Sequence, residues 1–241
     1  MNFFAGSDCV ALYAISDLHL PLGVDKPMDI FGKNWENYVE KLRDNWQSVV
    51  KPEDIVVLPG DFSWATYIED AKKDFDFLHE LNGKKILLKG NHDYWWETLK
   101  KMKNFAEENG YDDISFLQNI CIESNEFAIC GTRGWNLPTA PNSKEKDRKI
   151  YEHELIRLEM SLSAASENSV KIVFLHYPPV TKNCINNEFV SLMKKYGVKT
   201  CVYGHLHANS AGSAMTGMID GINYLLVSCD YLGFMPVKLS E

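Results

Sequence analysis

Short apolar runs alternate with amphipathic segments along most of this chain, and that alternation is the strongest constraint on its fold. Apolar runs bounded by turn residues predict buried strands, whereas apolar residues recurring at helical spacing predict helices. Strands that alternate with helices indicate an α/β layered fold. The expected strands are 10–16, 55–58, 85–88, 114–117, 120–123, 126–130, 171–175, 199–203, 222–228 and one near 235–239. The expected helices are 35–50, 68–78, 95–109, 151–162 and 187–196.

Two features modify this simple alternation. Several short strands near 114–130 and 213–239 predict mixed sheets rather than purely parallel ones, and Ser124-Asn125 is typical of a hairpin turn. Residues 134–147 combine Gly, Trp, Asn, Pro and mixed charges, so we expect a loop there. Such a loop is either a lid over a site or a connection that is merely mobile.

The length and composition suit one compact domain, which we expect to span residues 1–241. The 241 residues are 45% hydrophobic and 24% charged, which provides material for a sizeable core. The 25 Lys and Arg against 33 Asp and Glu give a formal charge of −8. This charge argues against nucleic acid or an anionic membrane as a partner, because both favour a basic surface. A phosphorylated substrate is still possible, because bound metal cations reverse the local field.

Targeting signals and disulfides are not expected. The apolar run at the N-terminus stops at Asp17 and has no basic region before it, and no other window is long enough to cross a bilayer. The cysteines contain no Cys-x-x-Cys pair, and several lie in apolar strand-like runs. We therefore expect free thiols in a reducing, cytoplasmic compartment. The cysteines are Cys9, Cys121, Cys130, Cys184, Cys201 and Cys229.

Polar side chains that can bind metal follow directly after five of the expected strands. Ligands of open α/β sheets gather beyond the carboxyl ends of the strands, so we expect these five segments to converge on one pocket. The glycines before Asp61, Asn91 and His205 suit tight turns, because a residue without a Cβ lets the backbone leave the sheet. The five segments are Asp17-Leu18-His19, Gly60-Asp61, Gly90-Asn91-His92-Asp93, His176-Tyr177 and Gly204-His205-Leu206-His207.

The ordered set of segments is more specific than any of its members. Gly-Asp is a common turn dipeptide, and a single histidine after a strand, such as His176, is more often a hydrogen-bonded core residue than a ligand. Five of the seven histidines nevertheless lie within the set, which leaves only His79 and His153 on expected helices. The set as a whole therefore predicts a metal site.

The order of these motifs, over residues 17–207, resembles that of the calcineurin-like metallophosphoesterase superfamily. The resemblance implies a four-layer αββα sandwich, in which two mixed β-sheets pack face to face with helices outside. Within the superfamily the chain is most similar to a group of bacterial predicted phosphohydrolases of undefined substrate. The motifs that carry this closer similarity are Gly60-Asp61-Phe62-Ser63-Trp64-Ala65, Asn91-His92-Asp93-Tyr94-Trp95-Trp96, Gly131-Thr132-Arg133-Gly134-Trp135 and His176-Tyr177-Pro178-Pro179.

The resemblance also implies a binuclear metal centre. The ligands of the first ion would be Asp17, His19, Asp61 and His207, and those of the second Asp61, Asn91, His176 and His205. Asp61 would then bridge the ions, which a carboxylate can do because its two oxygens carry several lone pairs. Two cations about 3.5–4 Å apart can share a hydroxide and clamp both sides of an in-line displacement at phosphorus. Mixed imidazole and oxygen ligands favour manganese, with iron or zinc as alternatives, and argue against a calcium or magnesium cage.

His92 is expected to act beside the metals rather than as a ligand. By the resemblance it would donate a proton to the leaving oxygen or orient the phosphate. Many members of the superfamily carry an Asp that orients this histidine, in the pattern Gly-Asp-x-x-Asp, but the matching residue here is Trp64. Either another carboxylate orients His92 or the residue works without one, and Asp93 is adjacent only in sequence.

Two further features adjoin the predicted site. Arg133 lies between glycines after an expected strand, where its guanidinium could reach a substrate phosphate; the alternative is a surface or ion-pairing arginine. The aromatic run Tyr94-Trp95-Trp96 is expected to pack in the core, with base stacking as the alternative.

The predicted function is metal-dependent hydrolysis of a phosphomonoester or phosphodiester, with a small soluble phosphorylated substrate. A nuclease would use the same chemistry, but the acidic charge and the lack of a basic stripe argue against nucleic acid. A protein-interaction scaffold on the same fold is the alternative from another class, yet a scaffold does not need a complete set of ligands together with His92. A structural metal site would make little use of the weak neutral ligand Asn91.

Overall fold

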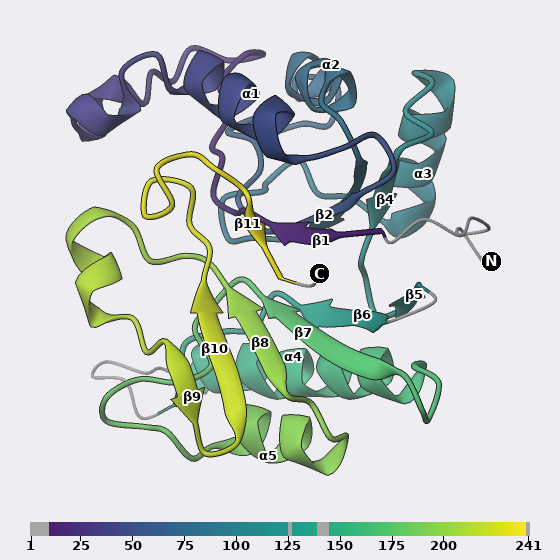
Figure 1. Ribbon diagram of the computed structural model, residues 1–241, viewed down its shortest axis with the longest axis vertical. Helices are drawn as coiled ribbons and strands as arrows, with labels where there is room; N and C mark the ends of the chain where they lie inside the picture. Colours follow the sequence, from purple (N-terminus) through teal and green to yellow (C-terminus); the bar gives the residue numbers. More distant parts are fainter. Residues whose placement is uncertain (1–9, 125–126, 139–144, 240–241) are drawn as a thin grey trace.

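Two β-sheets pack face to face in the computed structural model, which describes residues 10–124, 127–138 and 145–239 (Figure 1). Within these residues the first sheet has the order β11-β1-β2-β3-β4 and the second β5-β6-β7-β8-β10-β9. The strands of the first sheet are β1 Leu12–Ala14, β2 Ile55–Pro59, β3 Lys84–Leu88, β4 Ile114–Phe116 and β11 Val237–Lys238. Those of the second are β5 Ile122–Glu123, β6 Phe127–Thr132, β7 Val170–Leu175, β8 Thr200–Tyr203, β9 Gly217–Ile219 and β10 Ile222–Leu226.

Both sheets are mixed, as the short strands predicted. Strands β1 to β4 run parallel, and β11 pairs antiparallel with β1 at the edge. In the second sheet β6, β7, β8 and β10 are parallel, whereas the edge strands β5 and β9 are antiparallel to their neighbours. The parallel strands of each sheet therefore end on the same side, which gathers the segments that follow them.

Helices cover the outer face of each sheet and complete a four-layer αββα sandwich, so the predicted fold class is confirmed. Helices α1 Tyr38–Val49, α2 Lys72–Glu80 and α3 Leu99–Glu108 lie over the first sheet (Figure 1). Helices α4 Glu145–Ser163 and α5 Glu188–Lys195 lie over the second. Short 3₁₀ helices occupy Asp29–Phe31, Lys33–Trp35 and Ala208–Ser213.

Three apolar clusters fill the spaces between the four layers. The cluster between the sheets contains Ile55 and Val57 of β2 together with Phe174 of β7. The intervening residues of β2, Val56 and Leu58, belong instead to the cluster beneath α1, α2 and α3. A third cluster joins the second sheet to α4 and α5. Because both faces of these strands are covered, the strands read as continuous apolar runs in the sequence.

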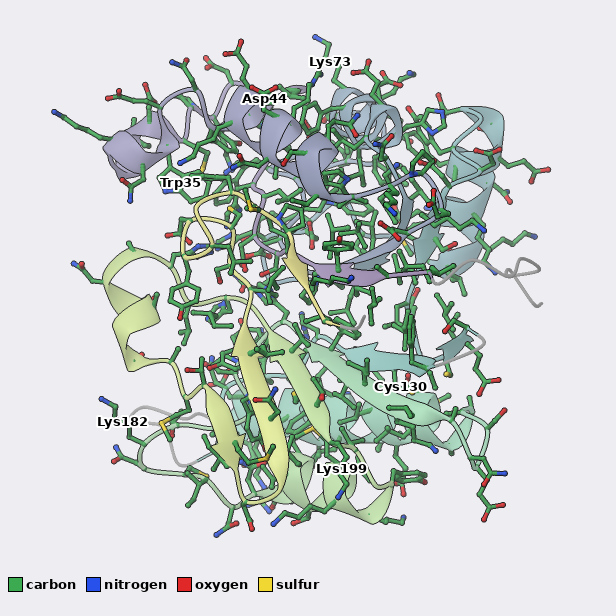
Figure 2. The ribbon with its side chains drawn as sticks, in the orientation of Figure 1. Trp35, Asp44, Lys73, Cys130, Lys182 and Lys199 are labelled. Carbon is green, nitrogen blue, oxygen red and sulfur yellow. The ribbon has the colours of Figure 1, made fainter. Side chains whose placement is uncertain are left out.

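Charged side chains mark the outer surface of the helical layer. Asp44 of α1 and Lys73 of α2 are exposed and point away from the sheet (Figure 2). Among the helices of the described residues, none is both long enough and apolar enough to cross a membrane. The five described cysteines are free thiols, as expected, and Cys9 lies outside the described residues.

Some boundaries differ from the expected ones. The helix expected over 95–109 begins at Leu99, because Thr98 has extended backbone and its side chain caps the N–H of Lys101 at 3.4 Å. The helix expected from 151 begins at Glu145, so the loop expected over 134–147 is shorter. The helix expected from 68 begins at Lys72. Residue 125 of the expected hairpin turn and residues 139–144 of the expected loop lie outside the described residues.

Candidate metal centre

Seven polar side chains meet where the parallel strands of the two sheets end. The first sheet contributes residues that follow β1, β2 and β3: Asp17, His19, Asp61 and Asn91. The second sheet contributes residues that follow β7 and β8: His176, His205 and His207. The structure thus brings together the side chains that the sequence predicts as metal ligands.

Four of these residues have backbone conformations that are unusual for anything but glycine. The φ angle is 61° at Asp17, 46° at His19, 54° at Asp61 and 71° at His205. Left-handed backbone is unfavourable for such residues and persists only where the surroundings enforce it. The Asp17 N–H donates to the Gly60 carbonyl at 2.9 Å and the His19 N–H to the Asp61 carbonyl at 3.0 Å, so the neighbouring strand end holds this conformation.

Two glycines allow the strand ends to approach one another. A Cβ at Gly90 would overlap with the Asp61 carboxylate, and a Cβ at Gly204 would overlap with Asp17 and Ser16. The absence of a side chain at these positions therefore places the carboxylates directly against the neighbouring backbone.

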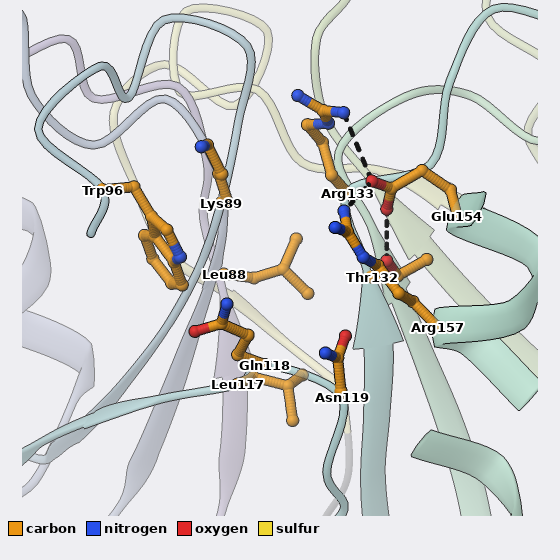
Figure 3. A pocket seen from close by; sticks show the side chains of 10 residues that line it. All are labelled: Leu88, Lys89, Trp96, Leu117, Gln118, Asn119, Thr132, Arg133, Glu154 and Arg157. Atoms are coloured by element: carbon orange, nitrogen blue, oxygen red, sulfur yellow. Dashed lines mark hydrogen bonds and ion pairs between the residues drawn. The ribbon is translucent and has the colours of Figure 1, made fainter. Parts of the chain in front are cut away.

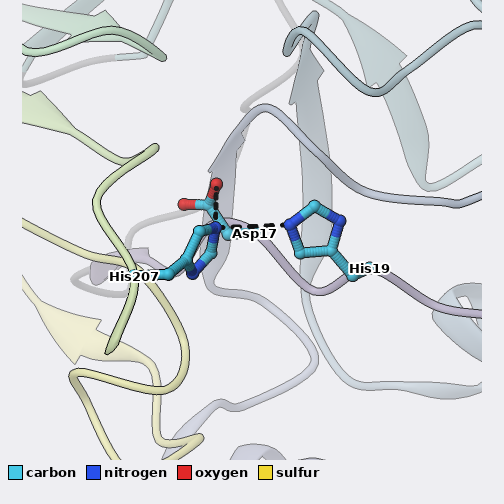
Figure 4. Close-up of side chains that lie close together, drawn as sticks. All are labelled: Asp17, His19 and His207. Carbon is cyan, nitrogen blue, oxygen red and sulfur yellow. Dashed lines mark hydrogen bonds and ion pairs between the residues drawn. The ribbon is translucent and has the colours of Figure 1, made fainter. Parts of the chain in front are cut away.

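The first group of donor atoms surrounds the Asp17 carboxylate (Figure 4). The Nε2 atom of His207 lies 3.1 Å from Asp17 Oδ1 and 3.3 Å from the Nε2 atom of His19. The same His19 atom lies 3.8 Å from Asp61 Oδ2. Asp17, His19 and Asp61 are buried, whereas His207 is partly exposed.

The second group surrounds the Nε2 atom of His176. This atom lies 2.7 Å from Asn91 Oδ1, 3.2 Å from His205 Nδ1 and 3.4 Å from Asp61 Oδ2. His176 is fully buried. Atoms that bind one ion at about 2.0–2.2 Å stand roughly 3 Å apart, and the distances in this group and the first are close to that spacing.

Hydrogen bonding fixes which nitrogen of His176 carries the proton. Its Nδ1 atom lies 3.1 Å from the Pro59 carbonyl, which can only accept, so Nδ1 must donate. In the neutral ring the Nε2 atom then presents a lone pair toward the oxygens of Asn91 and Asp61. Lone pairs that face one another repel unless a cation lies between them, so this arrangement fits a metal ion.

His207 is held in the same way. Its Nδ1 atom lies 3.2 Å from Asp230 Oδ1, and the other oxygen of Asp230 accepts the N–H of Ala208 at 2.8 Å. A carboxylate acceptor at Nδ1 keeps a proton there, so Nε2, which faces Asp17 and His19, is the nitrogen that a metal ion would bind in place of a proton. Both groups of donor atoms are therefore suited to a cation. Compact sets of metal-competent atoms occur at Asp17, His19 and His207 and at Asp17, Asp61 and His176.

Comparison with known families agrees with this geometry. The family profile of the calcineurin-like phosphoesterases matches residues 11–209. The chain belongs to the calcineurin-like phosphoesterase family. Membership confirms the resemblance found in the sequence to a family whose members hydrolyse phosphoester bonds with bound metal ions.

Individual relatives of this phosphoesterase are distant. An uncharacterized protein of Methanocaldococcus jannaschii is 34% identical over 101 residues, which cover 42% of this chain and 54% of that protein. The chain thus spans about half the length of the curated relative that it matches. Among solved structures, TT1561 of Thermus thermophilus has a TM-score of 0.57 at 16% identity, covering 96% of this chain and 99% of the other. Phosphopantetheinyl hydrolase from Mycobacterium tuberculosis has a TM-score of 0.55 at 14% identity, covering 95% of each chain. These likenesses show the fold.

The electrostatics of the phosphoesterase site follow from burial and from the crowding of carboxylates. Burial, with the charges of Asp93 and Asp17, raises the pKa of Asp61 to about 9. Burial also lowers the pKa of His176 to about 3. At His207 burial acts to lower the pKa, but Asp17 and Asp230 raise it to about 10. Carboxylates that share a buried site attract positive charge, which is the property a metal site needs.

Two carboxylates lie between the donor groups. Asp17 belongs to both compact sets of metal-competent atoms. The Oδ2 atom of Asp61, predicted from the resemblance to bridge two ions, is near His19 of the first group at 3.8 Å and His176 of the second at 3.4 Å. Asp61 therefore reaches both groups of the phosphoesterase site.

Asp93 supports the Asp61 turn and does not orient His92. Its carboxylate accepts the backbone N–H groups of Asp61 at 2.8 Å, Phe62 at 2.9 Å and Gly90 at 2.7 Å, and the indole N–H of Trp95 at 2.9 Å. The Asp93 side chain is thus fully occupied in fixing the loops that carry Asp61 and Asn91.

His92 is positioned by packing and by its backbone. Its N–H donates to Asp61 Oδ1 at 2.7 Å, and its ring lies 4.7 Å from the ring of Trp64, which also stacks on His19 at 4.5 Å. The Nδ1 atom of the His92 ring is buried and has no hydrogen-bond partner in the described part of the chain. Trp64, at the position where an orienting Asp is usual, therefore holds His92 by contact rather than by a hydrogen bond.

Arg133 is paired within the protein. Its Nη2 atom lies 3.2 Å from Glu154 Oε1, and its guanidinium lies 4.5 Å from the ring centre of Trp135. Its backbone carbonyl accepts the N–H groups of His176 at 3.0 Å and Tyr177 at 2.9 Å, so Arg133 adjoins the segment that carries a predicted ligand.

Sequence reasoning missed Asp230, Ser228 and the supporting role of Asp93. Asp230 and Ser228 follow β10, and the Ser228 hydroxyl donates to Asp17 Oδ2 at 3.0 Å. Ser228 and Asp230 could have been found by the pattern that indicated the predicted ligands, because they too are polar residues that follow an apolar strand. In the aromatic run, Trp95 and Trp96 pack in the core as expected, whereas Tyr94 is 60% exposed.

Proposed function

We propose that this protein hydrolyses a phosphomonoester or phosphodiester of a small soluble molecule with the help of two transition-metal ions. The observation that carries the proposal is the convergence of metal-competent atoms around two ring nitrogens. His176 Nε2 faces the oxygens of Asn91 and Asp61, and His207 Nε2 faces the Asp17 carboxylate. Groups so arranged repel one another unless a proton or a metal ion lies between them. Two adjacent groups of this kind support two cations rather than one.

The proposed assignment of ligands follows the two groups. The first ion would be held by Asp17, His19, Asp61 and His207, and the second by Asp61, Asn91, His176 and His205. Asp61 is the bridge in this proposal, supported by its position near both His19 and His176. Imidazole and carboxylate ligands together favour manganese, with iron or zinc as alternatives. When bound, such a pair of ions activates water at neutral pH and neutralises charge on the phosphate.

The chain itself supplies a proton donor and a phosphate contact. His92 lies beside Asp61 and is partly exposed, so its ring can reach a bound substrate and donate a proton to the leaving oxygen. Arg133 retains N–H groups that Glu154 does not use, and these can donate to a phosphate oxygen. The free thiols support a reducing, cytoplasmic compartment as the place of action.

The test is metal binding followed by hydrolysis. Chelator-treated protein should regain two ions per chain with manganese, and should then hydrolyse 4-nitrophenyl phosphate or bis(4-nitrophenyl) phosphate. His176→Ala should abolish most of this activity, whereas the matched control His153→Ala, at an exposed position on α4, should retain it. Two ions bound without turnover of either ester would contradict the proposal, as would full activity of the chelated protein.

A further inference from the structure

A small cationic cavity lies beside the metal centre, at the ends of β3, β4 and β6. Its volume is about 40 Å³, roughly three times the 10–15 Å³ that one water molecule needs, so it admits a single compact group. We call it the basic cavity; its lining residues are Leu88, Lys89, Trp96, Leu117, Gln118, Asn119, Thr132, Arg133, Glu154 and Arg157.

The basic cavity carries a positive charge in a protein whose formal charge is −8. Lys89, Arg133 and Arg157 supply three cations, and Glu154 is the only carboxylate among the lining residues. Lys89 follows β3 of the first sheet and lies on the opposite side of the cavity from the two arginines (Figure 3). The lining therefore carries two more positive than negative charges, and its three cationic side chains come from both halves of the molecule.

Glu154 fixes the arginines without exhausting their donors. Its Oε1 atom accepts from Arg133 Nη2 at 3.2 Å and from Arg157 Nη1 at 2.6 Å, and its Oε2 atom accepts the Thr132 hydroxyl (Figure 3). Each guanidinium has five N–H groups, so several donors of each arginine stay available. A preorganised pair of arginines of this kind is suited to recognise an oxyanion.

Buried polar atoms without partners line the same space. The Nε atom of Arg133 and the Oε1 atom of Gln118 are buried and have no hydrogen-bond partner in the described part of the chain. A buried guanidinium N–H without a partner is stabilised by an acceptor. If the Gln118 amide is rotated by half a turn, its NH₂ group takes the place of the oxygen and can donate a hydrogen bond as well. A ligand oxyanion would satisfy both side chains.

The position of the basic cavity links it to the reaction site. Lys89 precedes Asn91 by two residues, so their Cα atoms are within about 7 Å of each other. Arg133 accepts the N–H of His176 through its carbonyl at 3.0 Å. The cavity thus adjoins the donor group formed by Asn91 and His176, and Arg157 is half-exposed, which leaves a path from solvent.

We propose that the basic cavity binds a second oxyanion of the substrate, so that the preferred substrates are small phosphoesters that carry another phosphate or a carboxylate near the scissile phosphate. This inference rests on the proposed function and adds a substrate class to it. Leu88 and Leu117 close the cavity and its volume is small, so a sugar or nucleobase would not fit there.

The first experiment compares three substrates of equal carbon length on the metal-loaded enzyme. They are propyl phosphate, 3-phosphooxypropanoate and 1,3-propanediol bisphosphate. We expect kcat/KM for at least one of the charged substrates to exceed that for propyl phosphate by about tenfold or more, since hydrogen bonds to a charged group are among the stronger ones in proteins. The carboxylate and phosphate arms identify which oxyanion the cavity takes. Equal kcat/KM for all three esters would overturn the proposal.

Variants then connect that preference to the cavity. Lys89→Gln and Arg157→Gln should each lower the ratio of charged to neutral substrate by about tenfold, and Lys89→Arg should restore it. Lys103→Gln, an equal charge change at an exposed position of α3, is the matched control and should leave the ratio as it was. The proposal would be overturned if the ratio of charged to neutral substrate were the same in Lys89→Gln, in Arg157→Gln and in the parent enzyme. The preference would then come from another part of the site.

A binding experiment separates this inference from the proposed function. Chelator-treated protein is titrated with inorganic phosphate by calorimetry, which requires no turnover. Binding that is weakened about tenfold in Lys89→Gln and Arg157→Gln supports the basic cavity even if none of the esters is hydrolysed. Absence of phosphate binding, or equal affinity in the parent protein and these variants, contradicts it while leaving the metal centre unaffected.

Discussion

The first sheet supplies both carboxylates and the amide of the candidate metal centre, whereas the second sheet supplies three of its four histidines. Asp17, Asp61 and Asn91 follow strands of the first sheet, and their loops hold left-handed backbone at Asp17 and Asp61. His176 and His207 follow strands of the second sheet, and a hydrogen bond at Nδ1 fixes the orientation of each ring. The carboxylate charge of the candidate site thus comes from the first half, whereas the second half contributes imidazole rings whose orientation is fixed.

The contacts between the halves show that neither is complete alone. The Pro59 carbonyl that fixes His176 belongs to the first sheet, and the backbone N–H of His205 donates to Asp17 at 3.0 Å. Packing of the sheets therefore both assembles the donors and sets their protonation. We therefore expect substitutions in the first half mainly to change the negative charge of the site. Substitutions in the second half should mainly weaken one of the two proposed ions and not the other.

The largest effect is expected at Asp61, which reaches both halves. Asp61→Asn keeps the shape of the side chain but removes the charge that allows one residue to hold two cations. At least one ion should be lost, with affinity lowered more than the roughly 10–100-fold typical of supporting residues, together with nearly all activity. Metal analysis and hydrolysis assays test this, with circular dichroism to show that the fold is retained. The exposed control Asp44→Asn should behave like the parent, and full metal occupancy with near-normal turnover in Asp61→Asn would remove the binuclear assignment.

The second prediction sharpens the division of the histidines. His176→Ala and His205→Ala should weaken the same ion, because His205 Nδ1 lies 3.2 Å from His176 Nε2, and His207→Ala should weaken the other. Each loss should exceed the roughly 10–100-fold caused by removing a supporting residue. Metal titration of the three variants measures this. Loss of the same single ion in all three would show that the proposed ligand sets are wrong.

The third prediction concerns His92, which we propose acts from the first half without binding metal. His92→Ala should lower kcat by roughly 10²–10⁴-fold with both ions retained, and near the lower end because Trp64 rather than a carboxylate holds the ring. The loss should be large for an alkyl ester and smaller for a nitrophenyl ester, whose leaving group departs without a proton. Both substrates are assayed on samples of known metal content. Equal losses would leave His92 a positioning residue, and loss of metal would make it a ligand.

The smallest effect is expected at Asp230, behind His207 in the second half. Asp230→Asn leaves the His207 ring in place but removes the carboxylate that holds the proton on Nδ1. Affinity for the first ion should fall by roughly 10–100-fold while the second ion is unchanged. Competition with a fluorescent chelator gives both affinities. Equal weakening of both ions, or of neither, would break the proposed link between Asp230 and one half of the centre.

The sequence, read with the family resemblance, indicated the residues of the candidate site because each proposed ligand follows an apolar strand. Asp17, His19, Asp61, Asn91, His176, His205 and His207 were all visible in that way, and the structure brings them together. Asp230 follows β10 in a similar manner, but only its contact with His207 distinguishes it from an ordinary turn residue. The basic cavity was still less visible, because Lys89, Gln118 and Arg157 come from three separate elements with no shared motif.

The amino-acid sequence by itself determined the alternation of strands and helices, the mixed sheets and the residue types of the proposed ligands, since those depend on hydrophobic periodicity and on which residues end each strand. The tertiary structure alone decided the Nδ1 hydrogen bonds of His176 and His207, the use of Asp93 to hold the Asp61 turn, and the pairing of Glu154 with Arg133. Each of these depends on atoms that are distant in sequence and meet within about 3 Å in space, and a hydrogen bond is too short-ranged to be inferred from sequence spacing.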